Sequence, residues 1–331
     1  MTGDLIHAIL LFLGSAALVI FSGIYLARFG DALADLTGWG RLWVGTVLVA
    51  VATSLPELMV NISAVRIGAP ELAIANIFGA NMVNMFTLAM IALVFGSRWL
   101  FSRVAAEQGI LAVIAIILTG TALLLGVFPL RVVFLNVGLG SFLLLAAYVG
   151  GMRLLYLRRP ADRPNGADAS APEEMSVGRA WSFFGLASVA VVLGAFFLAY
   201  SADRISEITG LSGSFLGVVS VALVTTMPEA TVTVAAMRAG AVDLGMGNLY
   251  GSCAFNVLVL ALADPFYTAG PLLDTMDAAH IVAALAAILL MTLVLGQVLL
   301  RGQRRWAPVA PTMVAVGLIY LGSIYAVFQL S

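Results

Sequence analysis

Long apolar runs, separated by short polar turns, fill almost the whole chain. Each run holds about 20 mostly apolar residues, which is the length that a helix needs to cross the hydrocarbon core of a bilayer. Ten runs qualify, and they cover residues 5–27, 42–65, 72–97, 104–126, 131–152, 181–202, 214–237, 244–263, 278–300 and 307–329. The pattern therefore predicts an all-α integral membrane protein with ten transmembrane helices.

One long polar segment divides these runs into two sets of five. It lies between the fifth and sixth runs, and it contains three prolines, two glycines and several charged residues. This composition is typical of a flexible loop. We therefore expect a first five-helix unit over residues 1–157, a linker loop over 158–179 and a second five-helix unit over 180–331.

The two units repeat one another in sequence. A single shift of 172 positions superimposes polar residues, glycines and prolines along more than fifty positions. The pairs are Asp31 with Asp203, Thr37 with Thr209, Gly45 with Gly217, Thr53 with Thr225, Pro56 with Pro228, Glu57 with Glu229, Arg66 with Arg238, Asn76 with Asn248, Gly79 with Gly251 and Asn84 with Asn256. Because each unit has an odd number of spans, the second unit is predicted to be inverted across the membrane, as in many secondary transporters.

Composition supports the membrane assignment. Hydrophobic residues make up 62% of the chain and charged residues only 10%, whereas soluble domains have about 45–50% and about 25%. The net charge is −1 with no basic block, which argues against nucleic acid and leaves membrane lipid as the expected surroundings. Cys253 is the only cysteine, so an internal disulfide is excluded, and His7 and His280 stand alone and are expected to be structural or solvated. No cofactor is expected, and the sequence leaves the oligomeric state open.

The arginines predict an orientation in the cell membrane. Thirteen of the sixteen lie in loops that follow odd-numbered spans, and there is no lysine. Cytoplasmic loops carry the excess of positive charge in membrane proteins. The odd loops are therefore predicted to be cytoplasmic and both termini extracytoplasmic. The first run lacks the basic start and cleavage site of a signal peptide, and we expect it to be a transmembrane helix.

Two glutamates lie inside apolar runs, at the same place in each unit. Glu57 ends the sequence A-T-S-L-P-E, and Glu229 ends V-T-T-M-P-E. An ionisable group at membrane depth is unfavourable by several kcal/mol unless it has a partner, so such a group is a functional candidate by default. A protonated, purely structural glutamate is the alternative. The symmetric pair, each member beside a proline, favours a cation site.

Neighbouring oxygens fit the same interpretation. Proline removes a backbone donor, which is expected to free carbonyls near Ala50 and Ala222 for a cation. Hydroxyls from the two motifs would add neutral oxygens, although such hydroxyls often bond only within their own helix. These hydroxyls belong to Thr53, Ser54, Thr225 and Thr226.

The following span of each unit supplies amides. Asn84 and Asn256 end the blocks N-I-F-G-A-N-M-V-N and N-L-Y-G-S-C-A-F-N, and the second block also carries Ser252. Asparagine at this depth can instead hold helices together. Carboxylate, amide, hydroxyl and carbonyl oxygens together make a hard site, which favours Ca²⁺ or Na⁺ over Zn²⁺ or Cu²⁺.

These blocks resemble the α-repeats of the cation/Ca²⁺ exchanger superfamily, in its Na⁺/Ca²⁺ exchanger branch. The resemblance covers nearly the whole chain, and it implies an antiporter, not an enzyme, that exchanges Ca²⁺ for Na⁺ by alternating access at a mid-membrane site. It implies that Glu57 and Glu229 are central Ca²⁺ ligands and that spans 1 and 6 slide past the other eight. The residues that it implies would complete the sites are Thr53, Ser54, Asn84, Thr225, Thr226, Ser252 and Asn256.

The chain departs from the family pattern at four positions. Ala52 and Val224 stand where glycine is usual, Ala80 stands where serine is common, and Asn256 replaces the aspartate of many prokaryotic members. The H⁺-coupled branch usually has G-N-x-x-E in place of T-S-L-P-E, so the motif favours Na⁺. H⁺/Ca²⁺ exchange, or exchange of another divalent cation, is the alternative. A channel is a further class, and an intramembrane enzyme is disfavoured because H-E-x-x-H and G-x-S-x-G motifs are absent.

Overall fold

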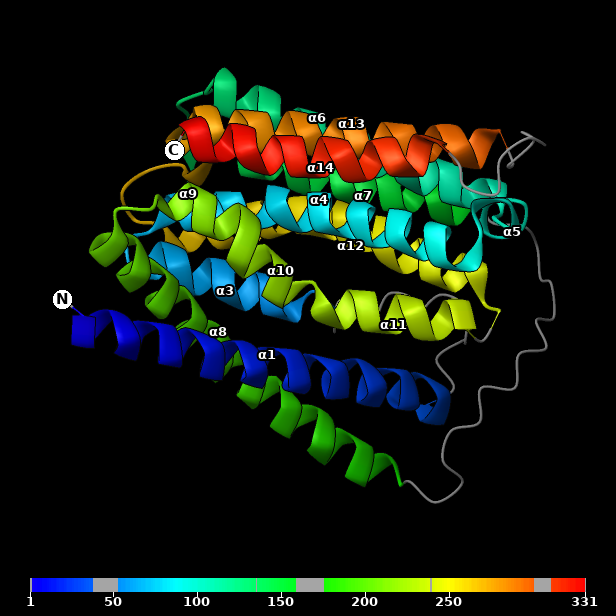
Figure 1. Cartoon of the computed structure of the whole chain (residues 1–331), viewed down its shortest axis with the longest axis horizontal. Coiled ribbons are helices and arrows are strands. Elements are labelled where there is room, and N and C mark those ends of the chain that lie inside the picture. The colour runs from blue at the N-terminus through cyan, green and yellow to red at the C-terminus, as the bar shows by residue number, and fades with distance from the viewer. Residues whose placement is uncertain are drawn as a thin grey trace.

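The computed structural model describes residues 2–37, 53–134, 136–158, 176–238, 240–300 and 311–330. They form an elongated helical bundle with the helices running along its length (Figure 1). The elements in chain order are α1 (Thr2–Thr37), α3 (Leu55–Arg66), α4 (Pro70–Phe95), α5 (Ser97–Phe101), α6 (Ala106–Val127), β1 (Val133–Phe134), β2 (Val137–Gly138), α7 (Leu139–Arg158), α8 (Val177–Thr209), α9 (Gly213–Leu216), η2 (Gly217–Val221), α10 (Ala222–Thr225), α11 (Met227–Arg238), α12 (Val242–Ala263), η3 (Asp264–Phe266), η4 (Leu272–Thr275), α13 (Ala278–Leu299) and α14 (Pro311–Leu330).

Membrane-length helices dominate the described residues. Eight of these helices are long and apolar enough to cross a bilayer. The pair Gly213–Thr225 and Met227–Arg238, bent by 44° at its break, meets the same criterion when taken together and would be a ninth span if it crosses as one unit. The predicted second span, 42–65, is described only from residue 53 onward, so its first part lies outside the described residues. The helical membrane class is confirmed, and the count of ten remains a prediction.

The helix ends follow the sequence repeat. Helices α11, α13 and α14 begin and end 172 residues after α3, α6 and α7 respectively. Helix α8 ends 172 residues after α1, and α12 begins 172 residues after α4. The two halves of the chain therefore encode the same succession of helices, and not only similar motifs.

The predicted fifth span, 131–152, begins later than expected. Helix α7 starts at Leu139, and the residues before it include the antiparallel pair β1 and β2. Arg131 and Asn136 have positive φ angles of 53° and 62°, which end any helix because L-residues rarely adopt this conformation within one. The hydropathy pattern included this turn in the predicted span because most of its residues are apolar, although its backbone is not helical.

A buried carboxylate holds this hairpin against the rest of the bundle. Asp264 is fully buried, and its Oδ2 accepts hydrogen bonds from Gly138 N and Ser141 Oγ, both at 2.7 Å. Its Oδ1 accepts one from Leu272 N at 2.6 Å. A buried polar group must be matched in this way to avoid an unfavourable desolvation energy. Asp264 therefore has a structural role at the end of α12.

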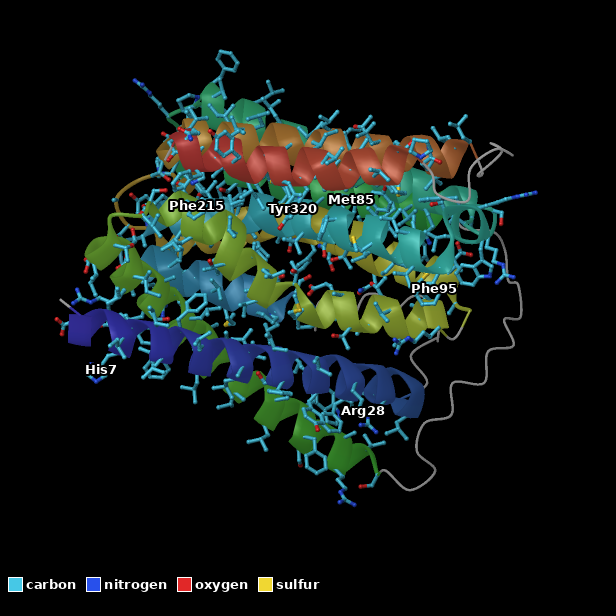
Figure 2. The ribbon with its side chains drawn as sticks, viewed as in Figure 1. His7, Arg28, Met85, Phe95, Phe215 and Tyr320 are labelled. Atoms are coloured by element: carbon cyan, nitrogen blue, oxygen red, sulfur yellow. The ribbon has the colours of Figure 1, made fainter. Side chains whose placement is uncertain are left out.

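Helices α1 and α8 form a layer of their own. They pack along each other more extensively than any other two elements, and they contact the remaining bundle mainly through α3, α10 and α11. Figure 1 shows the pair crossing the bundle on one side, and Figure 2 shows His7 and Arg28 on the outer side of α1. The broken helices therefore lie between this pair and the rest of the protein.

Glycines bring α4 close to the broken helix. A Cβ added to Gly79 on α4 would lie 2.6 Å from both Cα and the carbonyl oxygen of Val218. A Cβ on Gly217 would lie 2.6 Å from Ala75 Cβ and 2.8 Å from the carbonyl oxygen of Leu72. Since these neighbours include backbone atoms that cannot turn away, both positions require glycine for the observed approach. The contact falls where the second unit has a π-helical turn, a feature often found at functional sites.

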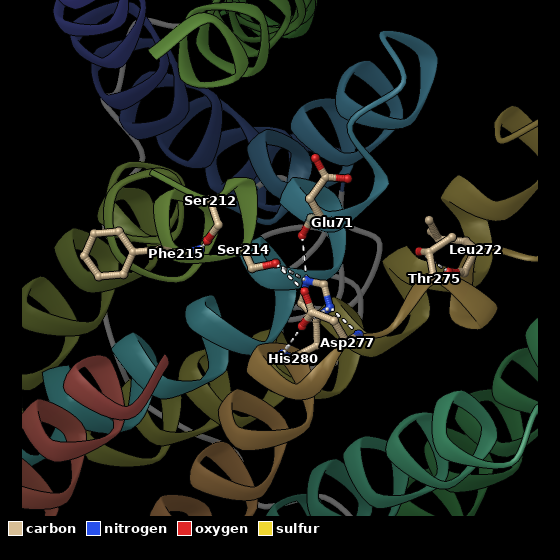
Figure 3. A network of polar contacts seen from close by, with 8 residues as sticks. All are labelled: Glu71, Ser212, Ser214, Phe215, Leu272, Thr275, Asp277 and His280. Carbon is tan, nitrogen blue, oxygen red and sulfur yellow. Dashed lines mark hydrogen bonds and ion pairs between the residues drawn. The ribbon is translucent and has the colours of Figure 1, made fainter. Parts of the chain in front are cut away.

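Polar contacts tie the start of α13 to α4 and α9 (Figure 3). His280 is fully buried, and its Nε2 lies 2.8 Å from the carbonyl oxygen of Glu71 and 3.2 Å from Ser214 Oγ. Asp277 caps α13 by accepting from His280 N at 2.9 Å, and Ser214 Oγ donates to it at 2.9 Å. Burial alone would raise the pKa of Asp277, but hydrogen bonds from His280 and Ser214 hold this pKa well below its usual range. His280 is therefore structural, as expected.

The repeat places a matching contact at the symmetry-related position, again between the two units. Gln108 lies 172 residues before His280, and its Nε2 donates to the carbonyl oxygen of Asp243 at 3.1 Å. Asp243 in turn lies 172 residues after Glu71. The equivalent helix pairs α13 with α4 and α6 with α12 are thus joined across the two units by the same kind of side-chain-to-backbone contact, through a histidine in one pair and a glutamine in the other.

The glycine contact gives a first prediction. Gly79→Ala should push α4 away from η2 and lower the thermal stability of the purified protein, because overpacking a close contact costs about 1–3 kcal/mol. Gly322→Ala is the matched control, since a Cβ there would meet no atom within 4 Å. Thermal unfolding in detergent measures both. Equal melting temperatures for the two variants would contradict the close-packing argument.

Candidate functional site

The two predicted glutamates come together at the centre of the bundle. Helices α3 and α11 begin near the middle and run toward opposite ends (Figure 1), and Glu57 and Glu229 lie in their first turns. Both side chains are fully buried, and their carboxylates interact electrostatically. A proline precedes each glutamate, which suits the first turn of a helix because no backbone donor is needed there. Two helix N-termini, each favourable for negative charge, thus meet at this point.

Hydroxyls from each unit surround the carboxylate of the other unit. Ser54 Oγ donates to Glu229 Oε1 at 3.1 Å, and Thr53 also lies beside Glu229. Thr225 of the second unit lies beside Glu57. Ser252 Oγ lies 3.5 Å from Glu229 Oε1. The site is therefore built between the units, and neither unit could form it alone.

Among the described residues, the two carboxylates of this site have no basic partner. Neither glutamate forms an ion pair with an arginine in the part of the chain that the structure describes. Both carboxylate oxygens of Glu57 and Oε2 of Glu229 have no hydrogen-bond partner among these residues. Two adjacent buried carboxylates cannot both remain ionised without a positive charge beside them. The arrangement therefore suits a cation, whether a metal ion or a proton.

The amides at the ends of the two blocks also lie at this depth. Asn84 and Asn256 are buried, with 1% and 0% exposure. Neither side-chain atom of Asn84 has a hydrogen-bond partner among the described residues, and neither does Oδ1 of Asn256. Asn256 lies one turn beyond Ser252 on α12, so both share one helix face. These buried amide oxygens are available as neutral ligands.

A second pair of amides supports the site from behind. Asn248 Nδ2 donates to the carbonyl oxygen of Glu229 at 3.1 Å and to Thr233 Oγ1 at 3.0 Å. In the first unit, Asn76 Nδ2 donates to Asn61 Oδ1 at 3.0 Å. The sequence repeat pairs Asn76 with Asn248 but gave no role to Asn61 and Thr233, although they too lie 172 positions apart. Their matching hydrogen bonds identify them as structural supports.

The expected free carbonyl at Ala222 is not found. The carbonyl oxygen of Ala222 accepts from Thr226 N at 3.1 Å and from Thr226 Oγ1 at 2.8 Å. Pro228 lacks the N–H that would bond four residues back, so the bond that is lost belongs to Val224 and not to Ala222. The corresponding carbonyl, that of Ala50, lies outside the described residues.

Comparison with known proteins places the chain in a family. The sequence profile described as "Sodium/calcium exchanger protein" matches residues 7–155 and again residues 179–330. The chain belongs to this family. The match confirms the resemblance found in the sequence, and the family is one of membrane transporters.

Relatives and solved structures agree with this assignment. The sodium/calcium exchanger MaX1 of Methanosarcina acetivorans is 26% identical over 299 residues, which cover 79% of this chain and 83% of that protein. A crystal structure of the H⁺/Ca²⁺ exchanger CAX has a TM-score of 0.67 at 14% identity, covering 97% of this chain and 88% of that one. The sodium-calcium exchanger NCX_Mj has a TM-score of 0.59 at 19% identity, covering 97% and 99%. At these identities the structural likeness establishes the fold.

Removal of either charge at the site gives a second prediction. Glu57→Gln and Glu229→Gln keep the side-chain volume but each halve the site's negative charge, so cation binding should weaken by about 3–5 kcal/mol, as for other unmatched buried charges. Cation transport by either variant in proteoliposomes should then fall below detection. Glu207→Gln is the control, because Glu207 is an exposed residue of α8 paired with Arg204. Normal transport by a folded Glu57 or Glu229 variant would exclude that residue from the site.

Proposed function

We propose that this protein is a secondary active antiporter that exchanges Ca²⁺ for Na⁺ at the site around Glu57 and Glu229. The observation that carries the proposal is the pair of buried carboxylates, one from each unit, with neutral oxygens around them and no basic partner among the described residues. Hard oxygen ligands of this kind are those that Ca²⁺ and Na⁺ prefer.

Unpartnered neutral oxygens favour Na⁺ over H⁺ as the counter-ion. A proton needs only one carboxylate oxygen, whereas Na⁺ needs several oxygens around it. The amide oxygens of Asn84 and Asn256 are buried without hydrogen-bond partners among the described residues, a state that is unfavourable unless a ligand uses them. By the family resemblance, the T-S-L-P-E motif that ends at Glu57 also favours Na⁺.

H⁺/Ca²⁺ exchange is the second candidate, and one observation favours it. The H⁺/Ca²⁺ exchanger CAX has a higher TM-score than the sodium-calcium exchanger NCX_Mj, 0.67 against 0.59. Two adjacent buried carboxylates could also exchange Ca²⁺ for protons. The counter-ion experiment below separates the two candidates.

Ten spans in two inverted five-helix units would give alternating access. The proposed units are residues 1–157 and 180–331, joined by the linker 158–179, and the 172-residue offset in helix ends supports them. The layer formed by α1 and α8 would move along the broken helices to open the site to one side at a time. Gly23 of α1 lies at this boundary, since a Cβ there would be 2.5 Å from Pro228 Cγ and 3.6 Å from Pro56 Cγ.

The arginine distribution gives a third prediction, on topology. Both termini should be extracytoplasmic and the linker 158–179 cytoplasmic, because positive residues concentrate in cytoplasmic loops. Single cysteines introduced into a Cys253→Ala background, one in the linker and one near each terminus, can be labelled with a membrane-impermeant reagent in intact cells. Labelling is expected at the termini only. Labelling of the linker would reverse the orientation.

The charge of the site gives a fourth prediction. With asparagine at 84 and 256, the site's carboxylates are Glu57 and Glu229, with a total charge of −2. One Ca²⁺ neutralises them, and so do two Na⁺, so exchange of three Na⁺ for one Ca²⁺ would move net charge. Membrane voltage should then bias exchange by about 2.3 kcal/mol per charge per 100 mV. By the family resemblance, asparagine at position 256 also implies that K⁺ is not required.

Proteoliposomes test this directly. Ca²⁺ uptake is measured with an outward Na⁺ gradient, then with an outward H⁺ gradient, each at two membrane voltages and with and without K⁺. Uptake driven by Na⁺, dependent on voltage and indifferent to K⁺, is expected. Uptake driven only by H⁺ would establish the second candidate, and an absolute K⁺ requirement would refute the charge count.

A further inference from the structure

We propose that Asn81 is a positioning residue that holds Asn256 with its amide oxygen presented to the cation site and disfavours a carboxylate at position 256. This inference rests on the proposed function, because it assigns a role within the same site. Asn81 is not among the residues whose oxygens are expected to bind the ion. It is fully buried on α4, one residue after Ala80 and about one helical turn before Asn84.

Asn81 lies where the two units meet. Its Nδ2 donates to the carbonyl oxygen of Cys253 at 3.2 Å, and Cys253 is the residue 172 positions further along the chain. Asn81 therefore bonds to the residue that occupies its own place in the second unit. A residue can contact its repeat partner in this way only near the axis that relates the two units.

The backbone carbonyl fixes the orientation of two amides in succession. A carbonyl oxygen only accepts hydrogen bonds, so the Asn81 atom that faces Cys253 must be the NH₂ group. The Oδ1 of Asn81 then faces the other way, where it accepts from Asn256 Nδ2 at 3.0 Å. Because the NH₂ group of Asn256 is used there, Oδ1 is the atom of Asn256 that remains unpartnered among the described residues.

This unpartnered oxygen is on the side of the site. Asn256 follows Ser252 by one helical turn on α12, and Ser252 Oγ lies 3.5 Å from Glu229 Oε1. If Asn256 turned its amide over, it would present NH₂ groups to the cation and bring its oxygen against Oδ1 of Asn81. The relay from Cys253 through Asn81 prevents this turn, and the cation meets an acceptor that is already oriented.

The same relay acts on the choice of residue at position 256. An aspartate there has no NH₂ group to donate, so its carboxylate would face the Oδ1 of Asn81. Asn81 cannot turn over to meet it without setting its own oxygen against the Cys253 carbonyl. The relay thus favours the uncharged asparagine and keeps the charge of the site at that of the two glutamates.

The first unit lacks this relay. The position that corresponds to Asn81 is Cys253, whose thiol is a weak donor, and the residue that corresponds to Asn256 is Asn84. Neither side-chain atom of Asn84 has a hydrogen-bond partner among the described residues. Asn84 lies beside the Cys253 thiol, which is a weaker partner than the amide of Asn81, so the two sides of the site differ although the sequence repeat makes them alike.

A double-mutant cycle tests the role of Asn81. Asn81→Leu keeps the approximate volume and removes both hydrogen bonds, and it should raise the Ca²⁺ concentration for half-maximal uptake about tenfold, the effect of one hydrogen bond to a ligand group. The maximal rate should change little. In an Asn256→Ala background the same substitution should have no further effect, since Asn81 acts only through Asn256. Asn81→Ala replaces the leucine variant if that variant does not fold.

Controls separate this inference from the proposed function. Glu207→Gln, at an exposed residue outside the relay and the site, should leave Ca²⁺ uptake unchanged. The cycle is also measured as thermal stability without Ca²⁺ or Na⁺, where Asn81 and Asn256 should again be coupled. A wild-type protein that takes up no Ca²⁺ but retains this coupling would refute the function and support the relay. Additive effects of the two substitutions in both measurements, or wild-type uptake by the Asn81 variants, would refute the relay.

Discussion

The rest of the structure depends on two carboxylates that are buried side by side with no basic partner among the described residues. Burial of a charge in an apolar bundle is unfavourable by several kcal/mol unless it is matched. Glu57 and Glu229 are placed at facing helix N-termini and lie beside hydroxyls, which lower this energy without cancelling the charge. A bound cation would stabilise a site of this kind. The breaks place helix N-termini, which favour negative charge, beside the two carboxylates.

Under the proposed alternating access, the repeat would let such a site serve both sides of a membrane. Each carboxylate is contacted by hydroxyls of the other unit, through residues 175 positions apart in the case of Ser54 and Glu229. The contact residues therefore belong to the interface between units, and a small shift of one unit against the other changes both halves of the site together. The layer of α1 and α8 touches the bundle mainly at these broken helices, so movement of this layer acts where the ion would bind.

The two units carry different residues at some of their equivalent positions. Asn81 and Cys253 occupy equivalent places, and Asn81 donates to the backbone carbonyl of its counterpart, whereas the thiol of Cys253 is only a weak donor. His280 and Gln108 are equivalent as well, and they make the same contact with different chemistry at the two ends of the bundle. The two units thus share the same arrangement of helices, while different residues at equivalent positions give each side of the site its own hydrogen bonds.

The sequence alone determined the membrane class, most of the spans, the 172-residue repeat and the two glutamates, because hydropathy and an internal repeat can be seen along the chain without knowing how its helices pack. It did not determine the β-hairpin before α7, where positive φ angles at Arg131 and Asn136 override apolar composition. It also misjudged the carbonyl of Ala222, which local hydroxyls occupy. Only the tertiary structure decided that Ser54 meets Glu229 and that Asn81 orients Asn256. These contacts join helices far apart in the chain, and a hydrogen bond depends on the position and direction of both partners, which packing between helices fixes and local sequence does not.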